Sequence, residues 1–450
     1  MNIVLLIVDS LRKQSIPTPG SATPSFFSTF AGESVSFERA YATECWTLPT
    51  HLSMFTGLMP SEHGAHFQTM AYEGKAPTIA ELLAERGYAT ELATRNPVLD
   101  GTIPGVARGF SRIELILADY GRGLNPLSMG LALSKPRFRR QIKASGFFTP
   151  EQRASREFLA HFARATLPAD DQVLAYAIKR LDRARRSREK LFLVCNLYDV
   201  HAPYPPSSRS IFRSWRSSTN WLENARMPFV LPHLGGHAYL REGFHLSDAN
   251  RKALLGRYES AIALMGERLE RFVSDAAAEG LLDDTLLIVT SDHGEAFGEH
   301  GLYLHDASVF QTHLHVPLYV RNPSLQPARV DDVVSMRHLF GLMLSAGSGD
   351  RLDDTLVGAE FRGRNPVARA EHFYYPHSPH MAKRFRVNQS AVIVEDRKYI
   401  RRGDTVMAYD LTADPLESSP REARSDCVIR TISDSDSGRC RTAIPEHVGQ

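Results

Sequence analysis

The sequence has 450 residues, of which 43% are hydrophobic and 23% are charged, an ordinary composition for a globular protein. The formal net charge is only +2, so no bulk charge directs the protein to nucleic acid or to a membrane surface. No apolar run approaches the roughly 20 residues of a membrane span, and the short apolar run at the start lacks the basic residues of a secretion signal, so we expect a cytoplasmic protein.

Apolar runs alternate with amphipathic segments along most of the chain. In chain order, the expected strands are residues 3–8, 88–94, 191–197 and 285–290. The expected helices are residues 49–56, 78–86, 170–186 and 250–278. Pro49 falls in the first turn of its helix, a position that tolerates proline. The alternation predicts an α/β fold with a large, mostly parallel sheet flanked by helices.

The chain is long enough for one large domain and one small one. We expect the large domain at residues 1–364, with insertions near 115–168 and 205–245 that interrupt the alternation and lie over the edge of the sheet. Strands expected at 390–395 and 398–401 place a small antiparallel subdomain at 365–417. The polar composition of residues 418–450 indicates a tail.

Three acidic residues directly follow expected strands. They are Asp9, Asp199 and Asp292. Because ligands bind at the carboxyl ends of the strands in sheets of this kind, these residues are candidates for one site at one edge of the sheet.

Several motifs resemble those of the sulfatase family in the alkaline phosphatase superfamily. In chain order they are NIVLLIVDS at 2–10, ECWTLPTH at 44–51, NLYDVHAPY at 196–204, TSDHGE at 290–295, HVPL at 315–318 and YDLTADPLE at 409–417. Their order along the chain matches the family's order. The resemblance implies an alkaline-phosphatase-like sandwich with a small C-terminal antiparallel sheet.

The resemblance places Thr47 at the position of the family's nucleophile. Sulfatases carry a Cys or Ser there, two residues before a proline, and oxidise it to formylglycine. A threonine cannot become an aldehyde, so the nucleophile would be a plain hydroxyl at the start of a helix. His51 stands where sulfatases carry an arginine that supports formylglycine. Cys45, the rival nucleophile, is out of register with Pro49 by two residues.

The resemblance also implies one divalent metal ion, held by Asp9, Asp292, His293 and Thr47. This mixed oxygen and nitrogen set suits manganese best, and zinc, calcium or magnesium stay open. Sulfatases often have two adjacent acids at the first position, where this chain has Ser10 after Asp9. That departure indicates fewer carboxylate ligands or a different metal.

We expect two catalytic histidines beside the nucleophile, His201 and His305, to contact the substrate or assist the leaving group. The predicted substrate contacts are His51, Asn96, Asp199 and Tyr204. Asp199 would orient His201. In an alternative reading, Asp199 and His201, with His305 or His372, bind a second metal ion, as in the two-zinc branch of the superfamily.

The resulting prediction is a metal-dependent hydrolase or phosphotransferase acting on phosphate mono- or diesters or phosphonate esters. The expected substrate is an anionic small molecule, or an ester of a glycan or a lipid headgroup, and no nucleic acid. One alternative is a sulfuric ester hydrolase, and another is a degenerate member that only binds a ligand. The sequence does not indicate the oligomeric state.

Overall fold

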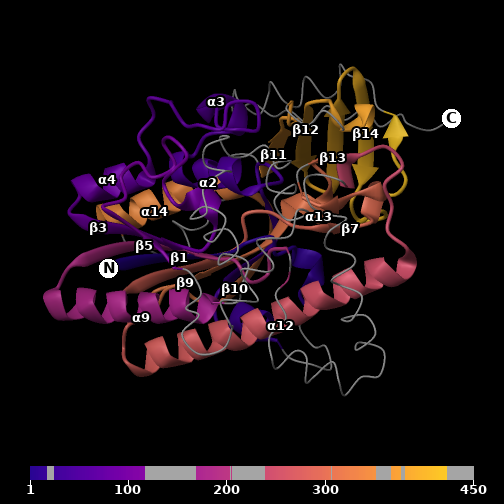
Figure 1. Ribbon diagram of the computed structural model, residues 1–450. Helices are drawn as coiled ribbons and strands as arrows, with labels where there is room; N and C mark the ends of the chain where they lie inside the picture. The colour runs from indigo at the N-terminus through magenta and orange to yellow at the C-terminus, as the bar shows by residue number, and fades with distance from the viewer. Residues whose placement is uncertain are drawn as a thin grey trace, which may run out of the picture.

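The computed structural model of the protein describes residues 1–17, 25–116, 169–202, 204, 239–305, 307–350, 366–376 and 381–422. Most of the two expected insertions and of the polar tail lie outside these residues. The described part contains a large sheet with helices on both faces and a smaller sheet beside it (Figure 1). This arrangement confirms the predicted fold class.

The large sheet has eight strands in the order β10-β2-β9-β6-β1-β5-β3-β4. Strand β9 is antiparallel to both of its neighbours, and the remaining pairs are parallel. The strands are β1 (Asn2–Val8), β2 (Val35–Tyr41), β3 (Tyr88–Thr94), β4 (Arg112–Leu115), β5 (Lys190–Leu197), β6 (Thr285–Thr290), β9 (His315–Arg321) and β10 (Ala328–Ser335). The sheet is therefore mostly parallel, as predicted.

Helices α9 (Asp170–Ser187) and α12 (Asp248–Ala278) cover one face of the sheet. Helices α2 (Thr47–Thr56), α4 (Ile79–Glu85) and α14 (Leu339–Ser348) lie on the opposite face (Figure 1). The shorter helices are α1 (Phe26–Ala31), α3 (Pro60–His63), α13 (Gln311–Leu314), η1 (Lys13–Ser15), η2 (Pro97–Leu99), η4 (Glu299–Gly301), η5 (Met336–His338) and η6 (Lys383–Phe385). Within the described ranges, no helix has both the length and the hydropathy of a membrane span.

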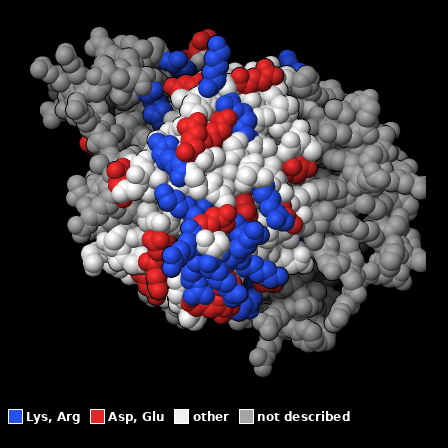
Figure 2. Space-filling model, turned by 90° about the vertical axis from the view of Figure 1, so that its left-hand side faces the viewer, with Lys and Arg blue, Asp and Glu red and all other residues white. Residues whose placement is uncertain are grey.

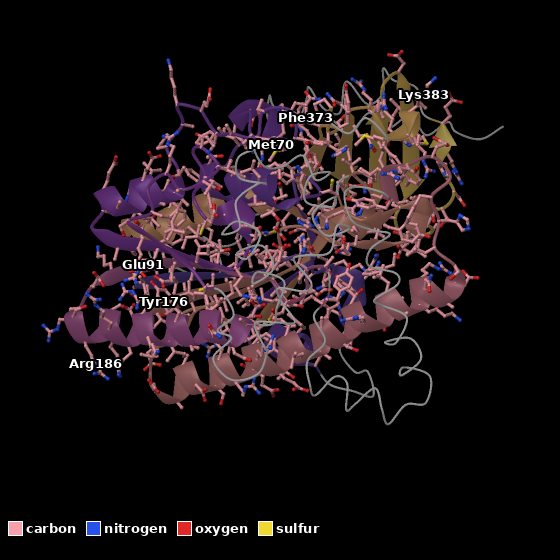
Figure 3. All side chains as sticks on the ribbon, viewed as in Figure 1. Met70, Glu91, Tyr176, Arg186, Phe373 and Lys383 are labelled. Carbon is pink, nitrogen blue, oxygen red and sulfur yellow. The ribbon has the colours of Figure 1, made fainter. Side chains whose placement is uncertain are left out.

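The core forms because apolar strands are covered on both faces. The side chains from Ile3 to Val8 in β1 are fully buried, and each such side chain stabilises the fold by roughly 1.5–3 kcal/mol. A polar contact also ties β3 to α9, where the Tyr176 hydroxyl donates to Glu91 over 2.6 Å (Figure 3). Arg180 of α9 pairs with the same carboxylate at 2.7 Å. These contacts fix α9 against the sheet.

The small sheet consists of five antiparallel strands: β11 (Val367–His372), β12 (Gln389–Val394), β13 (Arg397–Arg402), β14 (Thr405–Asp410) and β15 (Arg421–Glu422). Strands β7 (Ala296–Phe297) and β8 (Tyr303–Leu304) form a separate pair. The amide of Glu371 in β11 donates to the carbonyl of Thr43 over 2.9 Å. The small sheet thus contacts the segment that leads into α2.

The face at the amino ends of the central parallel strands carries charges of both signs. Figure 2 shows this face, with Lys and Arg gathered and Asp and Glu between them. Arg185 and Arg186 lie in the last turn of α9, where basic side chains favour the helix dipole, and both pair with Asp182. The basic side chains here are therefore partly neutralised by their neighbours.

The predicted elements in the described residues are confirmed, with small shifts at their ends. Strands β3 and β6 have the predicted bounds. Helix α2 begins at Thr47, two residues earlier than expected, and ends at Thr56, followed by the capping residue Gly57, whose φ of 73° favours glycine. The earlier start matters because it makes Thr47 the first residue of the helix.

Candidate active site

The candidate site lies at the carboxyl ends of neighbouring parallel strands. Asp9 follows β1, and Asp292 and His293 follow β6. Because β1 and β6 are paired in parallel, their ends reach the same edge of the sheet. Thr47 arrives at this edge as the first residue of α2.

Asp9, Asp292 and His293 form a compact group of possible metal ligands. One ligand atom from each lies within 4.8 Å of the others, and all three residues are fully buried. His293 Nε2 is 3.5 Å from Asp292 Oδ2 and 3.8 Å from Asp9 Oδ1. Among the described residues, Asp292 Oδ2 and His293 Nε2 have no hydrogen-bond partner. Such buried, unsatisfied polar atoms indicate a site for a group that the protein does not itself supply.

Hydrogen bonds fix the direction of these ligand atoms. The Nδ1–H of His293 donates to the carbonyl of Gly294 over 2.9 Å, which leaves the Nε2 lone pair toward the two carboxylates. Asp292 Oδ1 accepts from the amides of Ser10 and His293, at 3.2 and 3.0 Å. A Cβ atom at Gly294 would collide with the carbonyl of Thr312, so the motif needs glycine here.

The electrostatics of the group favour a cation. Burial, together with the charge of Asp9, raises the pKa of Asp292 well above its ordinary value. Two buried carboxylates side by side repel each other, and a divalent ion between them removes that repulsion. Carboxylate and imidazole donors suit several divalent metals. The residues therefore fit the metal site that the sequence predicts.

The hydroxyl of Thr47 lies beside this group. Asn96 Nδ2 donates both to Thr47 Oγ1, at 3.2 Å, and to Asp9 Oδ2, at 2.8 Å. Asn96 Oδ1 accepts from the amide of Val98, which fixes the orientation of the side-chain amide. Asn196 Nδ2 lies 3.3 Å from the same oxygen of Asp9. Asn96 thus joins the candidate nucleophile to a candidate metal ligand.

His51 lies one turn after Thr47 on α2 and faces the group. Its Nδ1–H donates to the carbonyl of Thr47 over 2.9 Å, and Nδ1 is 3.7 Å from Asp292 Oδ2. Burial lowers the pKa of His51 to about 4, so the ring is neutral at pH 7. A neutral imidazole cannot supply the charge of an arginine at this position.

Three imidazole rings lie next to one another at the site. The ring of His305 is 4.4 Å from that of His293 and 4.9 Å from that of His201, between centroids. His305 Nδ1 is 2.9 Å from Glu295 Oε1, and Glu295 Oε2 accepts from the Tyr204 hydroxyl at 2.8 Å. Burial raises the pKa of Glu295 to about 7. The structure therefore brings both predicted catalytic histidines to the metal group.

The carboxylate of Asp199 lies outside the metal group, in a buried network of ion pairs. Its carboxylate pairs with Arg95 and Arg268 and accepts from the amides of Ala169 and Asp170. His201 instead donates its Nδ1–H to the carbonyl of Ala202 over 2.6 Å. The expectation that Asp199 orients His201 is therefore corrected. The carboxylate of Asp199 pairs with two arginines instead, and the spacing of residues in the sequence does not predict these pairs.

The alternative second metal set does not assemble from the described residues. Asp199 is committed to its two arginines, and His372 contacts Glu44 at 2.9 Å. Cys45, the rival nucleophile, is fully buried with its sulfur 3.5 Å from His372 Nδ1. Tyr204, a predicted substrate contact, is buried and directs its hydroxyl to Glu295. Its role in substrate binding stays a prediction.

Two residues of the site carry no role in the sequence analysis. Asn196 is the last but one residue of β5 and contacts Asp9, and Glu295 contacts His305. Both lie inside the quoted motifs NLYDVHAPY and TSDHGE. The signal that could have found them is a polar side chain within or directly after an apolar strand, at the same edge as Asp9.

The fold and site place the chain in a known class. A large, mostly parallel sheet, a small antiparallel sheet and a polar site at the carboxyl edge form the alkaline-phosphatase-like sandwich. The Sulfatase family model matches residues 1–347, and the chain belongs to that family.

Several known proteins are similar to the chain. Choline-sulfatase of Rhizobium meliloti (strain 1021) is 23% identical, over 72% of this chain and 63% of its own length. N-acetylglucosamine-6-O-sulfatase of Bacteroides thetaiotaomicron is 20% identical, over 92% of this chain and 81% of its own. The crystal structure of phosphonate monoester hydrolase of Agrobacterium radiobacter has a TM-score of 0.63 at 19% identity, over 97% and 94% of the two chains. The chain thus spans less than two thirds of the choline-sulfatase it matches.

Proposed function

We propose that the protein hydrolyses phosphate mono- or diesters, or phosphonate esters, with Thr47 as the nucleophile. One observation carries the proposal. The Thr47 hydroxyl lies within a hydrogen-bonded group that also contains two buried ligand atoms without hydrogen-bond partners, Asp292 Oδ2 and His293 Nε2. A hydroxyl beside such a group is equipped to attack an anionic ester.

Asp9, Asp292, His293 and Thr47 would hold one divalent ion. When bound, that ion supplies Lewis-acid chemistry, neutralising the oxygens of the ester and lowering the proton affinity of the nucleophile. Manganese suits the mixed donor set best in our proposal, and zinc, calcium and magnesium are the alternatives. The fit of the buried, unsatisfied donors supports the site, whichever metal occupies it.

The chain's own groups account for the remaining steps. Thr47 Oγ1 gives its proton to solvent and attacks phosphorus in line, and the bond to the leaving oxygen breaks as the new bond forms. The amide of Asn96 holds Oγ1 in place, and the free N–H groups at the start of α2 face the ester oxygens. His201 or His305 gives a proton to the leaving oxygen. Water then attacks the phosphothreonine and restores the hydroxyl.

A different acceptor in the second step would change the product. An alcohol in place of water makes the protein a phosphotransferase, as in the lipoteichoic acid synthases and phosphoethanolamine transferases that the threonine site resembles. The expected substrate is an anionic small molecule, or an ester of a glycan or a lipid headgroup. We place these reactions in a catalytic domain at residues 1–364, completed by the small subdomain at 365–417.

The comparisons support two candidate reactions. The structural likeness to a phosphonate monoester hydrolase fits the phosphorus ester reading. The similarity to choline-sulfatase and to N-acetylglucosamine-6-O-sulfatase favours sulfuric ester hydrolysis as the second candidate. Thr47 weighs against the second, because it cannot provide formylglycine. His51, in place of the supporting arginine, weighs against it as well.

The test is turnover of matched nitrophenyl phosphate, phosphodiester, phosphonate and sulfate esters by wild type, Thr47→Ala and Thr47→Ser. Each protein is assayed with manganese, zinc, magnesium or calcium after chelation. We expect metal-dependent turnover of phosphorus esters, a loss of at least about 10³-fold in Thr47→Ala, and partial activity in Thr47→Ser, which keeps a hydroxyl.

Three outcomes would contradict the proposal. Phosphorus ester turnover that survives in Thr47→Ala would exclude threonine as the nucleophile. Turnover of the sulfate ester alone would establish the second candidate. A folded wild type that binds metal but turns over none of the esters would leave the degenerate binding protein as the reading.

A further inference from the structure

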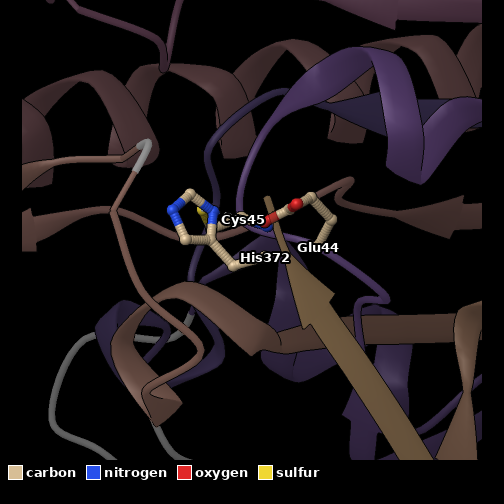
Figure 4. A group of neighbouring side chains, drawn as sticks. All are labelled: Glu44, Cys45 and His372. Atoms are coloured by element: carbon tan, nitrogen blue, oxygen red, sulfur yellow. Dashed lines mark hydrogen bonds and ion pairs between the residues drawn. The ribbon is translucent and has the colours of Figure 1, made fainter. Parts of the chain in front are cut away.

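A second buried group of side chains able to bind a metal ion includes residues of the segment just before Thr47. Glu44 and Cys45 come from the segment between β2 and α2, and His372 is the last residue of β11. Figure 4 shows the three side chains turned toward one another. Their exposed fractions are 0, 0 and 1%, and one ligand atom from each lies within 4.8 Å of the others.

We propose that Glu44, Cys45 and His372 bind a zinc-class divalent cation at a site separate from the catalytic one. A thiolate, an imidazole and a carboxylate are all common zinc ligands, and three of them leave a fourth, tetrahedral position for water. This proposal does not depend on the reaction that the enzyme catalyses, because none of the three residues has a role in that mechanism.

The separation of the donor atoms matches tetrahedral coordination. Zinc–nitrogen and zinc–sulfur bonds of about 2.0 and 2.3 Å at a tetrahedral angle place the two donors roughly 3.5 Å apart. The observed distance from Cys45 Sγ to His372 Nδ1 is 3.5 Å. Glu44 Oε1 is 2.9 Å from the same nitrogen, which requires an opening of only about 0.4 Å to reach the roughly 3.3 Å expected around zinc.

The surroundings hold the ligands as a metal site requires. Glu44 Oε1 accepts from the amide of Cys45 at 2.9 Å, and Oε2 accepts from the amide of Phe373 at 3.2 Å. The ring of Phe67 meets His372 edge-on, 6.2 Å between centroids, and stacks on Trp46 at 4.0 Å. Backbone donors thus orient the carboxylate, and an apolar shell shields the group from water.

Binding the ion exchanges protons for metal. Without the ion, the Nδ1–H of His372 donates to Glu44. The ion replaces the proton on the Cys45 sulfur, which is released to solvent, while the proton of the neutral His372 ring moves from Nδ1 to Nε2. Binding therefore strengthens as the pH rises. The sulfur ligand also separates the two sites chemically, because soft thiolate favours zinc while carboxylates accept manganese.

The position of this group explains what the ion would do. Cys45 lies two residues before Thr47, and His372 lies in the small sheet, beside the amide of Glu371 that bonds to Thr43. A metal ion between them cross-links the small sheet to the segment that carries the nucleophile. We infer a structural ion that positions the start of α2.

The test is a cobalt titration of the full-length, metal-free protein, followed by absorption spectroscopy. Cobalt bound to a thiolate gives a sulfur-to-cobalt charge-transfer band in the near ultraviolet, which the catalytic group, without sulfur, cannot give. We expect this band in wild type, with an intensity at saturation that corresponds to one thiolate-bound cobalt ion per chain. Cys45→Ser should abolish the band, and His372→Gln should weaken cobalt binding at this site by roughly 100-fold or more.

Matched controls assign the band to Cys45. Cys195→Ala changes a buried cysteine of β5 outside the group, and a Cys427→Ser, Cys440→Ser double variant changes the remaining two. Both should keep the band, so the assignment holds even if Cys45→Ser fails to fold. A wild type without the band at saturating cobalt, or a band lost in either control but kept in Cys45→Ser, would overturn the proposal.

Discussion

Two groups of buried charged residues lie at the same edge of the sheet, and they differ in how completely the protein satisfies them. In the network around Asp199, two arginines and two amides supply the partners of the carboxylate. In the candidate active site, Asp292 Oδ2 and His293 Nε2 have no hydrogen-bond partner among the described residues. Both groups follow apolar strands, but the carboxylate of Asp199 has all its partners, whereas a carboxylate oxygen and an imidazole nitrogen of the active-site group have none in the described part of the chain.

The difference separates structural charge from functional charge. A buried ion pair with all of its partners in place has no unmet demand for a ligand, and it mainly penalises the loss of either member. In the active-site group, two buried carboxylates repel each other beside an oxygen and an imidazole nitrogen that have no partner within the described ranges, and this arrangement favours an added cation. Burial and position alone therefore do not separate these two groups, whereas the unsatisfied carboxylate and imidazole atoms do.

The largest expected effect is the loss of catalysis when a carboxylate of the active-site group is removed. Asp292→Asn should lower kcat/KM by roughly 10³-fold, about 4 kcal/mol of transition-state stabilisation, because a metal ligand and its charge are removed. Metal content and turnover would be measured together. Asp182→Asn, which alters a partly exposed pair on α9, is the control and should leave both unchanged. If Asp292→Asn kept full activity, the active site could not lie at this edge of the sheet.

Loss of a charge from the network around Asp199 should instead lower the stability of the protein. Asp199→Asn should lower the free energy of unfolding by up to about 3–5 kcal/mol, since Arg95 and Arg268 lose the carboxylate they share and keep only Asp170 and Asp171 as acidic partners. In chelator, Asp292→Asn should leave that free energy equal or higher, because it relieves repulsion from Asp9. Urea unfolding at pH 7 measures both. If the two variants lose stability equally, the distinction between the groups fails.

A smaller effect is expected at the leaving group. His305→Gln should slow esters of poorly acidic alcohols by about 10²-fold, because a proton donor is lost. Nitrophenyl esters, whose leaving group needs little protonation, should be slowed much less. The dependence of kcat/KM on the leaving-group pKa is the measurement. Equal slowing of all esters would indicate that His305 positions the substrate instead.

The smallest expected effect is the contribution of His63 to the pH dependence of stability. Burial lowers the pKa of His63, which lies outside both groups, from 6.5 to about 4. As the pH falls, His63 becomes protonated in the unfolded chain at a higher pH than in the folded chain. The contribution of His63 to stability is therefore complete above pH 6.5 and is lost as the pH falls toward 4. The loss reaches about 2 kcal/mol at pH 5. Urea unfolding from pH 7 to 5 should show a flatter decline for His63→Gln than for wild type, and parallel curves would exclude this origin.

Much of the fold could be predicted because hydrophobic periodicity follows the sheet closely. The runs that became β3 and β6 have the expected bounds, and a strand that delivers Asp9 to the sheet edge needs only local sequence to be found. Asp292 and His293 could be placed for the same reason. The meeting of these residues follows from parallel strand pairing.

What could not be predicted depends on partners distant in sequence. Asp199 follows its strand just as Asp9 does, yet Arg268 of α12 takes its charge, and nothing near Asp199 in the sequence announces that arginine. The amide of Asn96 bridges Thr47 and Asp9, three segments that only the fold brings together. The imidazole of His372 meets Cys45 for the same reason.

The first residue of α2 has one more consequence, for the biology of the chain. The side chain of Thr47 carries a methyl group on its Cβ, so no oxidising enzyme can convert it to an aldehyde. The nucleophile we propose therefore needs no maturation enzyme and none of that enzyme's cofactors. Activity in a foreign host should then follow the amount of folded protein and the supply of metal alone.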